Sequence, residues 1–129
     1  MRTPRSRHLV QGFVLLLAIV AAHAAHAEEF PADAKVPTAA EITAGFQGRS
    51  FDFKAANGAL VRTNYAKEGN SMTVVFGGGR SDNGTWTAED GRICLEMRTI
   101  PSACNDLRII GGDFHLRRSN GEIVRLEPR

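Results

Sequence analysis

From residue 48 onward, apolar and polar residues alternate along the chain with a period of two, the pattern of β-strands that bury one face. The stretch MTVVF at 72–76 is representative. Segments rich in Gly, Asn and Asp separate such stretches and favour tight turns between neighbouring strands. The pattern predicts eight strands, at 51–55, 60–67, 72–76, around Trp86, and at 93–97, 103–110, 114–116 and 123–126.

Eight short strands joined by tight turns predict an all-β fold, an antiparallel eight-stranded meander. Such a meander buries one face best by closing into a small barrel or by folding into a lipocalin-like sandwich. We expect Asp82-Asn83-Gly84 to turn the chain into the fourth strand. The aromatic side chains are expected in the core, with an apolar cavity at the barrel mouth as the alternative for some of them.

One short α-helix precedes the strands, and we expect it at 38–47. Thr38 and Glu41 have the spacing of a capping box, in which each side chain binds the other residue's backbone N–H. Ile42 and Phe46 are four positions apart and therefore share one helix face. A helix this short does not persist alone in water, so it must pack against something apolar.

The first 27 residues have the three parts of a secretory signal peptide. Three arginines near the start precede an almost wholly apolar run at 9–22, and Ala25-His26-Ala27 has the form that signal peptidase cleaves. A run of that length is too short to cross a bilayer, which takes about 20 residues of helix, so an uncleaved membrane anchor is the weaker alternative. We expect a periplasmic or secreted protein of a Gram-negative bacterium, with no membrane span after cleavage.

The remaining chain is expected to comprise a flexible or loosely docked lead-in at 28–37 and one β domain at 38–129. Of the 16 Lys and Arg residues three lie in the signal peptide, so 13 remain against 14 Asp and Glu. The mature chain therefore carries a net charge near −1. A nucleic-acid partner, which attracts proteins with a large positive field, is not expected.

The two cysteines, Cys94 and Cys104, both lie in the predicted mature chain. An even number of cysteines in an exported protein favours a disulfide, with free thiols or a metal pair as the alternative. The predicted strands place both side chains on the outer face. Pairing them also sets Arg92 opposite Asp106, a favourable cross-strand ion pair.

The chemistry-bearing side chains do not form a catalytic signature, and no catalytic residue, metal or cofactor is predicted. The outer face of the later strands and the nearby glycine loop carry a candidate binding surface, for which a simple solvated face is the alternative. Its residues are Arg80, Glu96, Arg98, Arg108, His115 and Arg117. Asp113 lies two positions before His115, so a His–Asp relay is conceivable on one strand face, although the sequence places no nucleophile beside it.

Short motifs resemble a known family. They are TAAEI at 38–42, FQGRSF at 46–51, GTW at 84–86, RIC at 92–94, and Cys104. Together they resemble an uncharacterised family of small exported proteobacterial β proteins, the domain of unknown function 995, over 38–126. The resemblance implies an envelope-facing β domain with paired cysteines, and it carries over no catalytic residue. A looser likeness is to periplasmic lysozyme inhibitors, whose Ser-Gly-x-x-Tyr loop this chain lacks.

Three functions follow as hypotheses. The first is a monomeric, non-enzymatic binding module for an envelope glycan or protein. The alternative is an inhibitor of a cell-wall hydrolase such as lysozyme, which would insert the loop at 77–84 into the enzyme's cleft. The third is a small hydrolase that uses His115.

Overall fold

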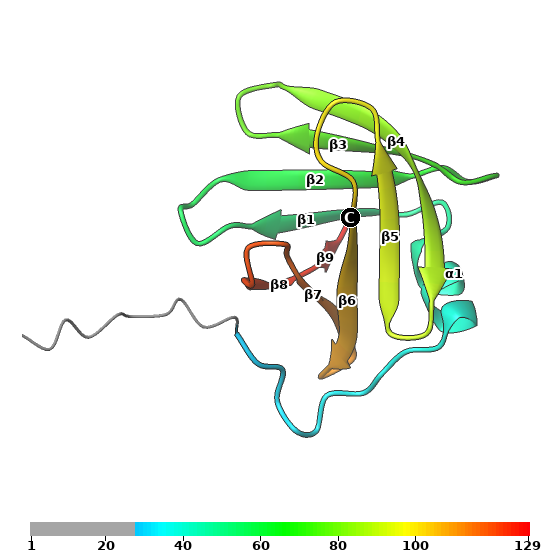
Figure 1. Ribbon diagram of the computed structural model, residues 1–129, viewed down its shortest axis with the longest axis vertical. Helices are drawn as coiled ribbons and strands as arrows, with labels where there is room; N and C mark the ends of the chain where they lie inside the picture. The colour runs from blue at the N-terminus through cyan, green and yellow to red at the C-terminus, as the bar shows by residue number, and fades with distance from the viewer. Residues whose placement is uncertain (1–27) are drawn as a thin grey trace, which may run out of the picture.

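The computed structural model describes residues 28–129, so the predicted signal peptide lies outside the described residues. Within these residues, nine strands form one antiparallel sheet in which β1 to β8 each pair with their neighbours along the chain (Figure 1). The strands are β1 (Ser50–Lys54), β2 (Leu60–Tyr65), β3 (Ser71–Phe76), β4 (Ser81–Glu89), β5 (Arg92–Met97), β6 (Ala103–Ile110), β7 (Asp113–Arg117), β8 (Ile123–Arg125) and β9 (Glu127–Pro128). The predicted all-β antiparallel meander is confirmed. No helix within 28–129 has the length and apolar character needed to span a bilayer.

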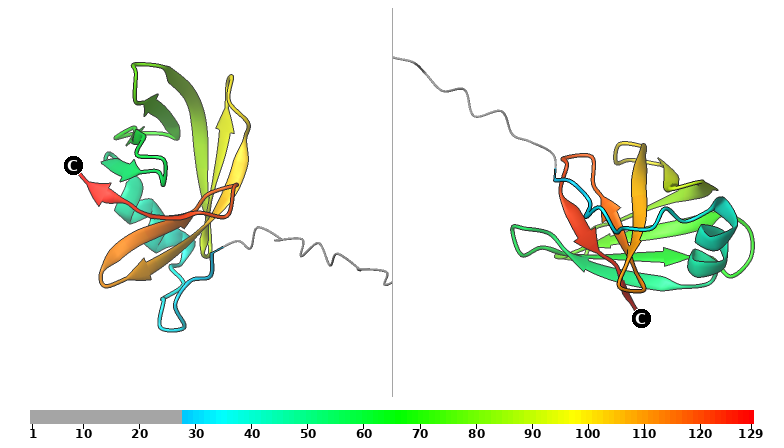
Figure 2. Two further views of the ribbon diagram at one scale, coloured as in Figure 1. Left: turned by 90° about the vertical axis from the view of Figure 1, so that its left-hand side faces the viewer. Right: turned by 90° about the horizontal axis from the view of Figure 1, so that it is seen from below.

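The last predicted strand, 123–126, is divided between two neighbours. β8 pairs with β7, whereas β9 pairs with β1 at the other edge of the sheet. Leu126 lies between the two pieces, and its backbone N–H donates to Phe114 at 2.9 Å. The sheet order therefore runs β8-β7-β6-β5-β4-β3-β2-β1-β9 and returns to its starting segment, which makes a nearly closed barrel (Figure 2).

The predicted helix is present as α1 (Ala39–Phe46), with Thr38 as its N-cap and the capping box to Glu41 formed. Its two apolar side chains, Ile42 and Phe46, are fully buried. The Phe46 ring lies 4.8 Å from Phe51 and 5.0 Å from Tyr65, measured between ring centroids. The helix therefore closes one end of the barrel.

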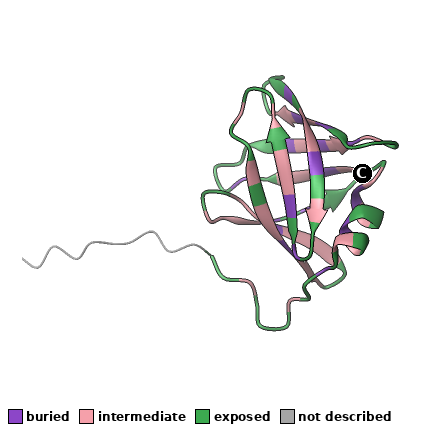
Figure 3. Ribbon diagram, turned by 45° about the vertical axis from the view of Figure 1, so that its right-hand side comes forward, coloured by how far each residue is buried: buried purple, intermediate pink, exposed green. Residues whose placement is uncertain are grey.

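The alternation of the sequence corresponds to the two faces of the sheet, as colouring by burial shows (Figure 3). Ile93 and Leu107 are fully buried inside, whereas Cys94 and Cys104 lie directly opposite each other on the outer face and form the predicted disulfide. Arg92 is opposite Asp106 in the ladder, as expected.

The prediction of a turn at Asp82-Asn83-Gly84 is wrong, because these residues belong to β4. The chain turns earlier, where Gly78 and Gly79 adopt φ values of 99° and 91°. Asp82 is drawn inward, since its carboxylate accepts the backbone N–H groups of Thr99 and Ile100 at 3.0 and 2.9 Å. That long-range contact outweighs the local preference of Asp and Asn for turns.

Residues 28–37 run along the outside of the sheet. Lys35 and Ile109 exchange backbone hydrogen bonds of 2.9 and 2.8 Å. At the start of the segment, the backbone N–H of Glu28 donates to Gly121, and its carboxylate accepts from the backbone N–H of Ile123. The lead-in is thereby attached both to β6 and to the β7–β8 turn.

Candidate functional site

The structure brings three of the six predicted surface residues together. Arg108 on β6 lies opposite His115 on β7, and Arg117 follows on the same face. The Phe30 ring of the lead-in lies 5.1 Å from the Arg108 guanidinium and 5.3 Å from that of Arg117. Arg117 also donates to the Asp106 carboxylate at 2.6 Å, a hydrogen bond that lowers the pKa of Asp106. Both arginines are therefore engaged within the protein.

The other three residues lie elsewhere. Glu96 is near the far end of β5, six residue positions along the ladder from Arg108, or about 20 Å at 3.3 Å per residue. Arg98 follows β5, where its backbone N–H donates to Asn83. Arg80 belongs to the β3–β4 turn and its guanidinium lies 5.6 Å from the Phe76 ring centroid. The six residues do not make one continuous surface.

The His–Asp pair does not have the geometry of a relay. His115 Nδ1 lies 3.2 Å from the backbone oxygen of Asp113, whereas the Asp113 carboxylate accepts from Arg125 at 3.0 Å. Throughout residues 28–129, no three His, Cys, Asp or Glu side chains are grouped to hold a metal ion.

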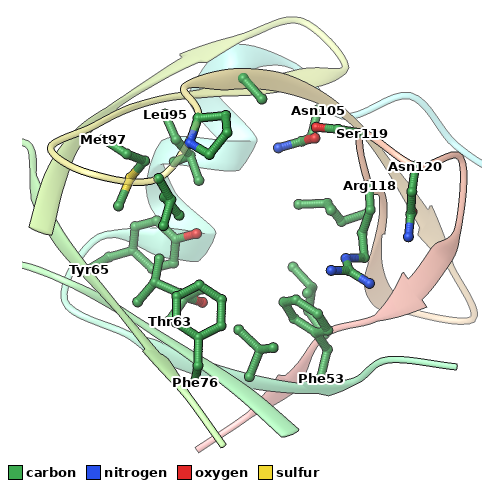
Figure 4. Close-up of a pocket in the computed structure, with 17 residues that line it drawn as sticks. Phe53, Thr63, Tyr65, Phe76, Leu95, Met97, Asn105, Arg118, Ser119 and Asn120 are labelled. Atoms are coloured by element: carbon green, nitrogen blue, oxygen red, sulfur yellow. The ribbon is translucent and has the colours of Figure 1, made fainter. Parts of the chain in front are cut away.

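A cavity of about 300 Å³ lies inside the barrel, at the end away from α1 (Figure 4). Inward-facing side chains from strands all around the sheet form its wall, because every second residue of a barrel strand points to the interior. The wall is mostly apolar; its larger members are Phe53, Val61, Val74, Phe76, Leu95, Met97, Leu116 and Leu126.

Uncharged polar side chains interrupt this apolar wall; besides Ser119 and Asn120 in the β7–β8 turn, three of them come from strands. Thr63 and Tyr65 are neighbours on the inner face of β2, and Asn105 extends from β6 (Figure 4). Thr63 is 7% exposed, and its Oγ1 is buried without a hydrogen-bond partner in the described part of the chain. Burial raises the pKa of Tyr65 to about 12, so the phenol stays protonated at neutral pH. The nearby Thr63 hydroxyl has a smaller, lowering effect on this pKa, although the two hydroxyls do not form a hydrogen bond of normal geometry.

The β5–β6 loop and the β7–β8 turn, each held by hydrogen bonds, lie at the mouth of the cavity. Ile100 and Pro101 belong to the β5–β6 loop, which Asp82 holds through the two hydrogen bonds described above. On the opposite side, Arg118 in the β7–β8 turn pairs with Glu122 at 2.7 Å. This hydrogen bond lowers the pKa of Glu122. The charge of Arg118 is thus balanced within the protein.

From the sequence, an apolar cavity is predicted only as an alternative environment for some aromatic side chains. Thr63 is not among the predicted site residues. The available signal was a hydroxyl between Val61 and Tyr65, at an inward position of an alternating strand. Alternation assigns Thr63 to the interior, but it does not reveal whether the opposite wall supplies a partner.

Comparison with known proteins gives one family. The model described as "Protein of unknown function (DUF995)" matches residues 14–104, from within the predicted signal peptide to the second cysteine. Neither the curated proteins nor the solved structures include a match to this chain.

Proposed function

The chain belongs to the DUF995 family, whose description assigns no activity. We propose that it is a non-enzymatic binding module whose barrel interior holds a small, largely apolar molecule. The observation that carries this proposal is the cavity of about 300 Å³. Small-molecule sites are typically concave, mostly apolar and about 300–1,000 Å³ in volume, with a few polar groups that orient the ligand.

The interior is a better candidate than the outer face. Arg108 and Arg117 are covered by Phe30, and Arg117 is also paired with Asp106, so a polar envelope partner would have to compete with contacts already made. The inner wall, in contrast, presents apolar surface with space beside it. The site therefore supports a small-molecule ligand over the glycan or protein partner inferred from sequence.

An exported location supports the same role. The signal-peptide features and the Cys94–Cys104 disulfide both favour an oxidising compartment outside the cytoplasm. We propose that the processed protein acts there as a monomer, because one barrel supplies a complete cavity wall.

The proposal is tested by titrating the processed protein with the fluorescent apolar probe N-phenyl-1-naphthylamine. We expect saturable enhancement of probe fluorescence with a Kd of about 1–10 μM, a range typical of a small, unoptimised apolar ligand. Val74→Phe fills the cavity and should weaken binding at least about tenfold, since the added ring occupies the ligand's space.

The matched control is Val75→Phe, the next residue on the same strand, whose side chain faces outward. It should bind the probe like the wild type. No saturable enhancement in the wild type, or equal losses in the two variants, would refute binding inside the barrel.

A further inference from the structure

Resting on the proposed function of the cavity, we infer that the barrel interior selects uncharged molecules that carry a hydroxyl or carbonyl group, and that this group points inward to Thr63. The class includes alcohols, phenols and ketones with a compact or short apolar body. Hydrocarbons of the same shape and carboxylates of the same shape are the ligands that the site discriminates against.

The unpartnered hydroxyl of Thr63 is the first support. Buried polar groups in proteins are almost always hydrogen-bonded, so each exception calls for an explanation. Two side-chain atoms of the described residues are buried without a partner, Thr63 Oγ1 and Trp86 Nε1. Of these two residues, Thr63 lines the cavity and Trp86 does not. A ligand oxygen completes its hydrogen bonding once rotation about one side-chain bond of Thr63 turns the covered hydroxyl toward the cavity.

A second polar group lies beside Thr63. Tyr65 is two residues further along β2, on the same inner face, and its protonated phenol is a donor. The Asn105 amide, which extends from β6, offers both donors and an acceptor. A ligand hydroxyl can donate to Thr63 and accept from Tyr65, and a carbonyl can accept from both.

The charge of the wall excludes ionised head groups. Among the cavity-lining residues of the described chain, Arg118 is the one charged side chain, and its guanidinium is paired with Glu122 at 2.7 Å. It belongs to the turn at the mouth rather than to the inner end, where Tyr65 contacts Phe46. A carboxylate beside Thr63 would therefore be buried without a counter-charge, which is strongly unfavourable.

The orientation follows from the same arrangement. Thr63 and Tyr65 lie toward the helix-capped end, while Phe53 and Phe76 line the wall near the turns at the mouth (Figure 4). The ligand's apolar body thus contacts these rings, and its polar group lies deepest. This is opposite to the orientation of a detergent, whose head stays in water.

Three ligands that share one ring system test the inference by isothermal titration calorimetry on the processed protein at pH 7. They are naphthalene, 2-naphthol and 2-naphthoate. We expect 2-naphthol to bind at least about fivefold more tightly than naphthalene, the effect of one net hydrogen bond, and at least about tenfold more tightly than 2-naphthoate because of the uncompensated charge.

Thr63→Val removes the hydroxyl and keeps the shape of the side chain. It should reduce the 2-naphthol/naphthalene affinity ratio to about one without weakening naphthalene. Because the hydroxyl has no partner in the free protein, the Tm should not fall, an outcome that a structural hydroxyl would not give. Thr73→Val, on the outer face of β3, should leave the ratio unchanged. Tyr65→Phe provides a second variant that should lower the ratio.

The outcomes separate the two proposals. If none of the three ligands and no apolar probe binds, the proposed function fails and the inference fails with it. If naphthalene binds as tightly as 2-naphthol, if 2-naphthoate binds best, or if Thr63→Val and Tyr65→Phe both keep the wild-type ratio, binding inside the barrel stands and the inference is overturned.

Discussion

The two ends of the barrel are built from the same alternating strands but are filled differently. At the helix-capped end, the Phe46 ring lies within 5.0 Å of Phe51, Tyr65 and Phe114, and Phe46 itself is fully buried. At the open end, Phe76 is only partly buried and faces a cavity. The helix supplies the difference, because it inserts two side chains where the strands alone leave space.

The two ends are stabilised by different interactions. Packing of aromatic rings holds the helix-capped end. The open end depends on the Cys94–Cys104 disulfide, one residue pair from the end of the β5–β6 ladder, and on Asp82, which anchors the loop beyond it. Removing each interaction in turn should show how much each end contributes to the stability of the fold.

The largest effect is expected at the helix-capped end. Phe46→Ala should reduce the free energy of unfolding by about 3–5 kcal/mol, because it leaves a cavity in tightly packed surroundings. Phe76→Ala removes the same atoms beside existing space and should cost clearly less. Urea denaturation of both variants measures the difference, and equal losses would contradict the contrast between the ends.

The disulfide comes next. Replacing both Cys94 and Cys104 by Ala should cost about 3 kcal/mol, since the covalent link closes a short loop and restricts the unfolded chain. The β5–β6 loop should also loosen, so binding of the apolar probe should weaken. Dithiothreitol should lower the Tm of the wild type but not that of the double variant. If the Tm of the wild type does not change, the disulfide does not contribute to stability.

The smallest effect concerns Asp82 and depends on pH. The hydrogen bonds from the backbone N–H groups of Ile100 and Thr99 lower the pKa of Asp82 from 3.8 to about 2. A lowered folded-state pKa stabilises the fold above the unfolded-state value, and this contribution is lost as the pH falls from 3.8 toward 2.

Asp82→Asn should therefore have a lower Tm than the wild type at pH 7, and the gap should narrow in acid. Thermal unfolding followed by circular dichroism between pH 7 and pH 2 measures it. A gap that stays constant down to pH 2 would mean that the ionised carboxylate does not hold the loop.

The order of β1 to β8 and the faces of the sheet could be predicted from the sequence, because period-two alternation and turn residues are local signals. The same alternation placed Cys94 and Cys104 on one outer face, and pairing them gave the register that the structure shows. The capping box was also readable, as it needs only Thr38 and Glu41.

The features that the sequence did not reveal depend on distant parts of the chain. The turn at Asp82 was misplaced because its carboxylate is bound by residues 17 and 18 positions away. Arg108 and Arg117 of the candidate surface contact the Phe30 ring instead of being free. No periodic pattern in the sequence relates Phe30 to these two arginines. The cavity depends on how far apart the walls stand, and alternation does not encode that distance.

The short β9 segment has a consequence for the order of folding. It adds two residue pairs to β1, and Arg129 pairs with Asp52 across 77 positions of sequence. Contacts of such long range form slowly, because a large loop must close first. Until residues 127–129 are in place, the edge of β1 keeps unpaired N–H and C=O groups that another copy can bind. A shortened chain that lacks these residues should therefore associate edge to edge more readily than the full chain.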